Sequence, residues 1–220
     1  ANHYLRHDTD WVTAELSLTT DADQVPVVPG YLVSDRTEGG RRTMKTRTEA
    51  PILQFFSMQS AKYAIKSDTW RPGSGDPVAL SVHYHPAHEH NVKLMLDAMK
   101  LSLDQFSAAF SPYQFRQARI LEFPAYEKFA QAFANTVPYS EAIGFIQNHP
   151  AGRPEGDEKI DLVTYVTAHE IGHQWWAHQV IGADRQGSTL LSESFAQYSA
   201  LLVMEQLYGK DRIRKFLKYE

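Results

Sequence analysis

The sequence His-Glu-Ile-Gly-His at residues 169–173 has the residue types and the spacing of a zinc site. On an α-helix, side chains four positions apart project from the same face, so His169 and His173 can both bind one metal ion. Glu170, between them, is placed to act as a base toward water at that ion. We therefore expect half of a metal site on an amphipathic helix within residues 161–180.

A third ligand is expected from Glu193, which lies in the next helical pattern, at residues 190–208. Nineteen residues separate His173 from Glu193, enough for the end of one helix, a loop and the first turn of another. Three protein ligands with an open fourth position are typical of catalytic zinc, which would lower the pKa of a bound water towards about 7. Glu170 would take a proton from that water and later deliver it to the leaving amine. The alternative is a set of surface side chains joined by salt bridges.

Other polar and aromatic residues have simpler interpretations. Residues 83–90 hold four of the ten histidines and could form a second metal site, but no carboxylate or cysteine pattern accompanies them, so solvated loop residues are favoured. His178 follows His173 by five positions, so we expect it away from the ligand face, at the surface or behind the ligands. Trp175 and Trp176 are expected in the core behind the metal helix, with a substrate pocket as the alternative.

Composition excludes several classes of protein. With 22 Lys and Arg against 26 Asp and Glu among 220 residues, the formal charge of −4 gives no basic excess for nucleic acid. The apolar runs are too short to span a bilayer, so we expect a soluble domain, and the compartment is left open. Cysteine is absent, so histidine and carboxylate groups must hold any zinc.

The elements that must position these residues indicate an α+β fold. A β-rich N-terminal portion is expected at residues 1–75, ending at a turn-rich segment, and a second domain at residues 76–220 should combine a short mixed sheet with the metal-binding helices. Strand signals lie at residues 31–35, 41–48, 51–58, 61–65, 78–85, 119–123 and 141–146, and helical signals at residues 91–110, 161–180, 190–208 and from residue 211.

The flanking sequence narrows the class of metallopeptidase. Metzincins need glycine and histidine three and six residues past the second ligand, where this chain has Trp176 and Gln179. Residues 169–176 instead look like the zinc helix of the aminopeptidase-N-like gluzincins. Residues 192–198, Ser-Glu-Ser-Phe-Ala-Gln-Tyr, are similar to that family's Asn-Glu-Gly-Phe-Ala-x-Tyr segment.

This resemblance covers most of the chain. It implies the end of an N-terminal β domain followed by much of a thermolysin-like zinc peptidase domain that hydrolyses peptides, with His169, His173 and Glu193 as zinc ligands and Glu170 as general base. The bacterial branch in which such a domain follows permease-like membrane segments looks closest, which allows a parent protein anchored in a membrane. Oligomeric state and side-chain preference are left open.

The chain departs from the family pattern at two places. The Gly-x-Met-Glu-Asn exopeptidase strand corresponds to Pro-Tyr-Ser-Glu-Ala at residues 138–142, where only Glu141 matches. The resemblance implies that Glu141 binds the α-amino group of the substrate, and a solvent-facing carboxylate at a strand edge is the alternative. The family usually has eighteen residues before the third ligand, so nineteen imply a loop one residue longer near residues 183–188.

An oxyanion-binding tyrosine is expected tens of residues beyond the third ligand, but only 27 residues follow Glu193. Tyr208 and Tyr219 are too close in sequence to take that role. The last helical pattern also has no stop signal, which indicates a C-terminally truncated catalytic unit, with a short natural chain as the alternative. Two functions follow: a zinc aminopeptidase-like domain, or a zinc-binding scaffold or sensor with weak or no activity. Epoxide opening has precedent in the family, but no residue here supports it.

Overall fold

The computed structural model describes residues 10–147, 161–183 and 185–217. Its central element is a mixed four-stranded sheet in the order β11-β10-β9-β8. β8 and β9 pair as an antiparallel hairpin, whereas β9, β10 and β11 run parallel. The strands are β8 (Ala64–Trp70), β9 (Val78–Tyr84), β10 (Gln117–Phe123) and β11 (Thr136–Ser140).

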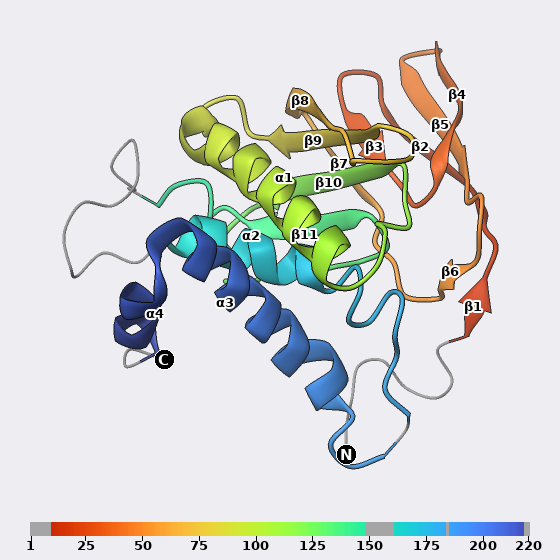
Figure 1. Cartoon of the computed structure of the whole chain (residues 1–220). Coiled ribbons are helices and arrows are strands. Elements are labelled where there is room, and N and C mark those ends of the chain that lie inside the picture. The colour runs from red at the N-terminus through yellow and green to blue at the C-terminus, as the bar shows by residue number, and fades with distance from the viewer. Residues whose placement is uncertain (1–9, 148–160, 184, 218–220) are drawn as a thin grey trace.

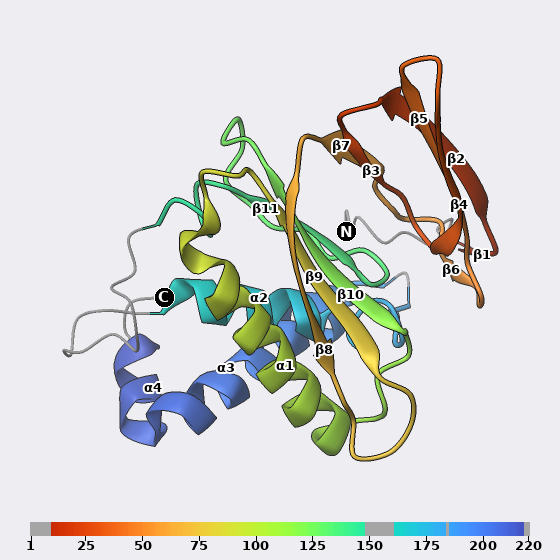
Figure 2. The ribbon, with the colours of Figure 1, turned by 90° about the horizontal axis from the view of Figure 1, so that it is seen from above.

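Helices cover one face of this sheet, and the N-terminal strands lie beyond the other (Figures 1 and 2). α1 crosses from β9 to β10 and buries an apolar stripe that includes Met95, Met99 and Phe106. α2 packs between α1 and α3, so the helix that carries the His-Glu-x-x-His motif has helices on two sides. The helical elements are η1 (Glu89–Asn91), α1 (Val92–Ala109), α2 (Leu162–Gly172), the π-helix η2 (Leu190–Ser194), α3 (Phe195–Tyr208) and α4 (Lys210–Phe216).

In the N-terminal part, the described residues 10–61 contain only strands and the turns that connect them. Its three sheets have the orders β2-β5-β4, β1-β6 and β3-β7. β4 and β5 pair as a hairpin, and Gly39 and Gly40 between them adopt φ angles of 57° and 76°, which suit a tight turn between right-twisted strands. The strands are β1 (Trp11–Val12), β2 (Glu15–Asp21), β3 (Val25–Val27), β4 (Tyr31–Glu38), β5 (Arg41–Arg47), β6 (Ile52–Leu53) and β7 (Gln59–Ala61).

Both strands and helices are present with a mixed sheet, so the α+β class is confirmed at that level. The predicted boundary near residue 75 falls in the turn between β8 and β9, whose ends pair as Trp70 with Val78. The four-stranded sheet thus takes one strand from the part before residue 75, and the division at residues 1–75 and 76–220 stays a prediction.

Several predicted elements differ from the structure, and the strand expected at residues 61–65 divides between β7, which ends at Ala61, and β8, which begins at Ala64. The strand expected at residues 141–146 is wrong, because those residues form turns and the strand is β11, just before them. Pro138 lies inside β11, which is tolerated because β11 is at the edge of its sheet. The strand expected at residues 51–58 shortens to β6. The helix expected to residue 180 ends at Gly172, and Ala177, with φ of 146°, excludes its continuation.

Among the described residues, no helix combines the length and the apolar character needed to cross a membrane.

Candidate metal centre

Three predicted ligands meet at one point. The Nε2 atoms of His169 and His173 are 3.0 Å apart, and an oxygen of Glu193 lies 3.4 Å from the first and 3.5 Å from the second. Bonds of about 2.0–2.2 Å in a tetrahedral site put zinc ligands roughly 3.3–3.5 Å from one another. The two distances to Glu193 fall in this range and the two nitrogens lie slightly closer together, so a small separation of the imidazole rings would give all three atoms the spacing of zinc ligands.

The close approach of α2 to α3 makes this meeting possible. Gly172 packs directly on α3: a Cβ atom added there would lie 3.3 Å from the Cα of Ala196. Such a contact is tighter than side chains usually tolerate, so glycine permits the two helix backbones to come together. Glu193 lies one turn before Ala196, within the π-helix η2 that leads into α3, and its side chain thereby reaches the histidines of α2.

The histidine surroundings suit metal binding. His173 Nδ1 lies 3.0 Å from the backbone oxygen of Trp176, so this nitrogen donates and Nε2 is left with its lone pair toward the ligand cluster. His169 Nδ1 is buried and has no hydrogen-bond partner within the described parts of the chain. Burial alone would lower the pKa of His173, but Glu193 and Glu170 raise it overall. Two imidazoles and a carboxylate form a donor set that zinc accepts.

Glu170 is buried beside the ligands. Burial raises the pKa of its carboxyl group, and the negative charge of Glu193 acts in the same direction, against the opposing effect of His173 and His169. One further influence is a hydrogen bond with the backbone of Ala132, which favours the ionised carboxylate. Glu170 Oε2 has no partner among the described residues. A buried carboxylate of raised pKa is a stronger base than an exposed one.

The segment that contacts Glu170 is one that the sequence analysis missed. Ala130 and Phe133 form isolated antiparallel bridges with Tyr139 and Thr136, so residues 130–133 run beside β11. This places Ala132 against α2, where its backbone oxygen also lies 3.1 Å from Nε2 of His178. Proteins use such an irregular edge beside a catalytic helix to present backbone groups to an extended ligand.

Gln174, directly after the second histidine, ties this segment to the metal helix. Its side chain donates to the oxygen of Phe133 at 3.0 Å and accepts from the N–H of Asn135 at 2.7 Å. Asn135 turns the chain with a φ angle of 52°, a conformation that asparagine tolerates better than most residues. No motif signals this role, because both partners of Gln174 are backbone groups about 40 residues away in sequence.

A partly buried arginine, Arg119, supports the same turn from the other side. Arg119 donates to the side chains of Thr136 and Asn135 and to the backbone oxygen of Val28 in the N-terminal part. Burial lowers the pKa of Arg119 to about 10. Arg119 thus links the N-terminal part to the turn that follows residues 130–133, and Gln117, which donates to Gly30 and Asn135, makes a parallel link.

The remaining predicted residues have definite positions. Glu141 does not join the triad: it lies in a separate cluster with His88 and Glu122. Trp175 is confirmed as a core residue at 2% exposure, and Trp176 packs against that core. His178 is not at the surface: it lies behind the ligands, and burial lowers its pKa to about 4.

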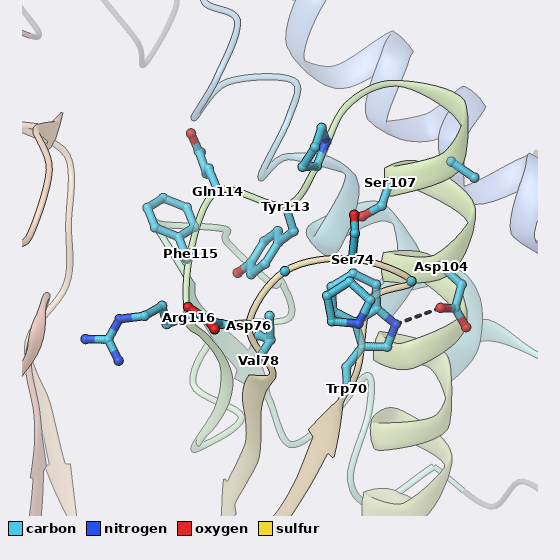
Figure 3. Close-up of a pocket in the computed structure, with 15 residues that line it drawn as sticks. Trp70, Ser74, Asp76, Val78, Asp104, Ser107, Tyr113, Gln114, Phe115 and Arg116 are labelled. Atoms are coloured by element: carbon cyan, nitrogen blue, oxygen red, sulfur yellow. Dashed lines mark hydrogen bonds between the residues drawn. The ribbon is translucent and has the colours of Figure 1, made fainter.

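Tyr208 cannot bind an oxyanion at the triad in this arrangement, because its hydroxyl donates to Asp161, the residue that caps the start of α2. Tyr219 lies outside the described residues. A hollow of about 490 Å³ lies at the far end of α1, where the Trp70 indole donates to Asp104 at 2.7 Å (Figure 3). None of the predicted site residues lines it.

Comparison with known proteins places this geometry in context. No protein-family model matches the sequence. Aminopeptidase N from Lactobacillus delbrueckii subsp. lactis is 26% identical over 199 residues, which cover 89% of this chain but 22% of that protein. The chain therefore spans about a fifth of this relative's length.

Solved structures share the fold. An M1 zinc metallopeptidase from Deinococcus radiodurans, solved as its E323A mutant, aligns with a TM-score of 0.71 at 19% identity, over 94% of this chain and 43% of that one. Legionella pneumophila aminopeptidase A, in complex with aspartic acid, aligns with a TM-score of 0.76 at 17% identity, over 92% of this chain and 24% of that one. The sequence and fold comparisons agree with each other and with the motifs.

Proposed function

We propose that the chain, which resembles the aminopeptidase-N-like gluzincins in sequence and in fold, is an aminopeptidase-like zinc metallopeptidase domain that hydrolyses peptide bonds. The convergence of His169, His173 and Glu193 within zinc-ligand distances carries the proposal. The buried base Glu170 beside them supports hydrolysis rather than storage of the ion. Zinc, when bound, supplies a Lewis acid that polarises a carbonyl and acidifies water.

Glu170 carries the proton in the proposed reaction. Its carboxylate takes a proton from water while the water oxygen forms a bond to the peptide carbonyl carbon. The same proton then passes to the amine nitrogen as the carbon–nitrogen bond breaks, so the carboxylate is regenerated. The raised pKa of Glu170 favours both transfers, since the group holds the proton long enough to deliver it.

The backbone beside the triad suits an extended substrate. The segment at residues 130–133 lies against Glu170 and is held there by Gln174 and His178. Glu193 is 38% exposed, so the ligand cluster opens to solvent on that side and a peptide can reach it. We therefore infer that the substrate lies along this edge with its scissile bond near Glu170.

Specificity for a free amino terminus is a separate question. The amine-binding role predicted for Glu141 stays a prediction, and its position with His88 and Glu122 supports the second candidate, a zinc-binding scaffold or sensor of weak activity. Screening the purified protein with aminoacyl substrates and internally quenched peptides separates the two. Zinc-dependent cleavage with kcat/KM well above background would eliminate the scaffold.

Substitution of Glu170 by Gln tests the mechanism. The amide cannot accept a proton, so we expect activity to fall by at least about 10²-fold while zinc content stays at the wild-type value. Glu127→Gln, at an exposed position outside the site, is the matched control and should retain activity. Equal activity of the Glu170→Gln variant and the wild type would refute the proposed role of Glu170.

A further inference from the structure

A second group of possible ligand atoms shares no residue with the triad. One atom each from His88, Glu122 and Glu141 falls within 4.8 Å of the other two. His88 Nδ1 contacts an oxygen of Glu122 directly and lies 3.7 Å from an oxygen of Glu141. The histidine-rich stretch therefore does meet carboxylates, but these come from residues 34 and 53 positions further along the chain.

The fold brings the three residues together at the carboxyl ends of parallel strands. His88 follows β9, Glu122 lies at the end of β10, and Glu141 follows β11. These strands are neighbours in the sheet and run in the same direction, so the residues that follow them meet at one edge. Ligands of open α/β sheets bind at this edge.

Backbone hydrogen bonds hold both carboxylates in orientation. One oxygen of Glu122 accepts from the N–H of His85 at 2.6 Å, and its other oxygen faces His88. One oxygen of Glu141 accepts from the N–H of Ala125 at 2.9 Å, and its other oxygen also faces His88. Fixing one oxygen so that the second points at a common centre is how proteins prepare carboxylate ligands.

The charge at this centre also favours a cation. Glu122 is 5% exposed, and among the described residues His88 is the one basic side chain within ion-pair distance of Glu122 or Glu141. Two carboxylates that share a single imidazole carry excess negative charge, and burying such charge is costly unless a cation offsets it. A divalent ion would offset it more completely than a protonated histidine.

An adjoining pocket supplies access. It has a volume of about 340 Å³ and is lined by both carboxylates together with Tyr63, His85 and Phe123. Water in this pocket can complete the coordination of an ion held by three side chains. We propose that His88, Glu122 and Glu141 form a second divalent-metal site, distinct from the triad and suited to zinc, because imidazole disfavours magnesium and calcium. It would clip together the ends of β9, β10 and β11.

Metal counting on the purified protein tests the inference. After loading with zinc and dialysis against a weak chelator, mass spectrometry of the metal should find two zinc ions per chain in the wild type. His88→Ala and Glu141→Gln should each lose one ion, as should His169→Ala at the triad, and His88→Ala combined with His169→Ala should lose both. Glu89→Gln and His90→Ala, exposed neighbours in the same stretch, are the matched controls and should keep two.

The outcomes separate this site from the triad. Two results would overturn the second site and leave the proposed function standing. The first is a single zinc ion per wild-type chain that is lost in His169→Ala. The second is a zinc count that neither His88→Ala nor Glu141→Gln changes. Loss of one ion in His88→Ala with no loss in His169→Ala would support the second site and contradict the triad. Circular dichroism of each variant shows whether a lost ion reflects the ligand or an unfolded chain.

Discussion

Replacement of Gln174 by Leu would test how the metal helix and the edge segment are joined. Gln174 is 1% exposed, and its amide makes two hydrogen bonds to backbone groups of Phe133 and Asn135. Leucine has a similar volume but leaves the N–H of Asn135 without its partner, whereas the oxygen of Phe133 still accepts from the N–H of Thr136 at 3.0 Å. The unsatisfied N–H costs about 1–3 kcal/mol and the lost second hydrogen bond to Phe133 about 1 kcal/mol, so the free energy of unfolding should fall by roughly 2–4 kcal/mol, less the small gain from a more apolar side chain.

Equilibrium unfolding in urea measures this loss. With a slope of about 2–3 kcal/mol per molar for a domain of this size, the midpoint should fall by roughly 1 M or more. Gln179→Leu is the matched control: that side chain is only partly buried and bonds at the surface, so its loss should stay below about 1 kcal/mol. Equal shifts for the two variants, or a loss below about 1 kcal/mol for Gln174→Leu, would refute the reasoning.

Three further predictions concern His83, the contact between α2 and α3, and the bound metal. Burial holds the pKa of His83 at about 4, below its ordinary 6.5, so the unfolded chain binds the proton first. The free energy of unfolding should therefore fall by about 1.4 kcal/mol per pH unit as the pH falls from 6.5 towards 4. In urea unfolding at pH 7, 6 and 5, His83→Phe should show a shallower decline than the wild type, and parallel declines would contradict this. Gly172→Ala places a Cβ atom against Ala196 and should push α2 and α3 apart, so the affinity for zinc should fall by about 10-fold. Titration against a competing chelator measures this affinity, and an unchanged value would show that α3 can shift without disturbing the ligands. Removal of bound metal by a chelator should lower the Tm of the wild type, because the ion binds the folded chain. The variant that combines Glu193→Ala with His88→Ala should show no such decrease, and an equal decrease in both proteins would place the stabilising ion elsewhere.

The triad could be predicted because each of its parts leaves a local signal. His169 and His173 lie four residues apart on a helix. Glu193 lies near the start of the next helical pattern, far enough along the chain for a loop to bring it back to the histidines. The second cluster leaves no such signal, since His88 meets its two carboxylates only through the parallel pairing of β9, β10 and β11. Pairing partners of parallel strands are separated by whole crossover connections, so sequence spacing does not reveal them.

The edge segment was missed for a different reason. Residues 130–133 form isolated bridges rather than a continuous ladder, and their sequence Ala-Gln-Ala-Phe has little β propensity. Their position is set by Gln174 and Arg119, which bond backbone or side-chain atoms at residues 133–136. Tertiary hydrogen bonds, not local preference, determine where this part of the chain lies.

The π-helix at Leu190–Ser194 has a consequence for how the chain tolerates insertions. A π-turn closes its hydrogen bonds five residues apart rather than four, so it holds an additional residue without moving the helices on either side. The family that this chain resembles usually has one residue fewer before the third ligand, and a turn of this kind absorbs such an addition inside the helix. An additional residue held in this turn therefore need not rotate Glu193 away from His169 and His173.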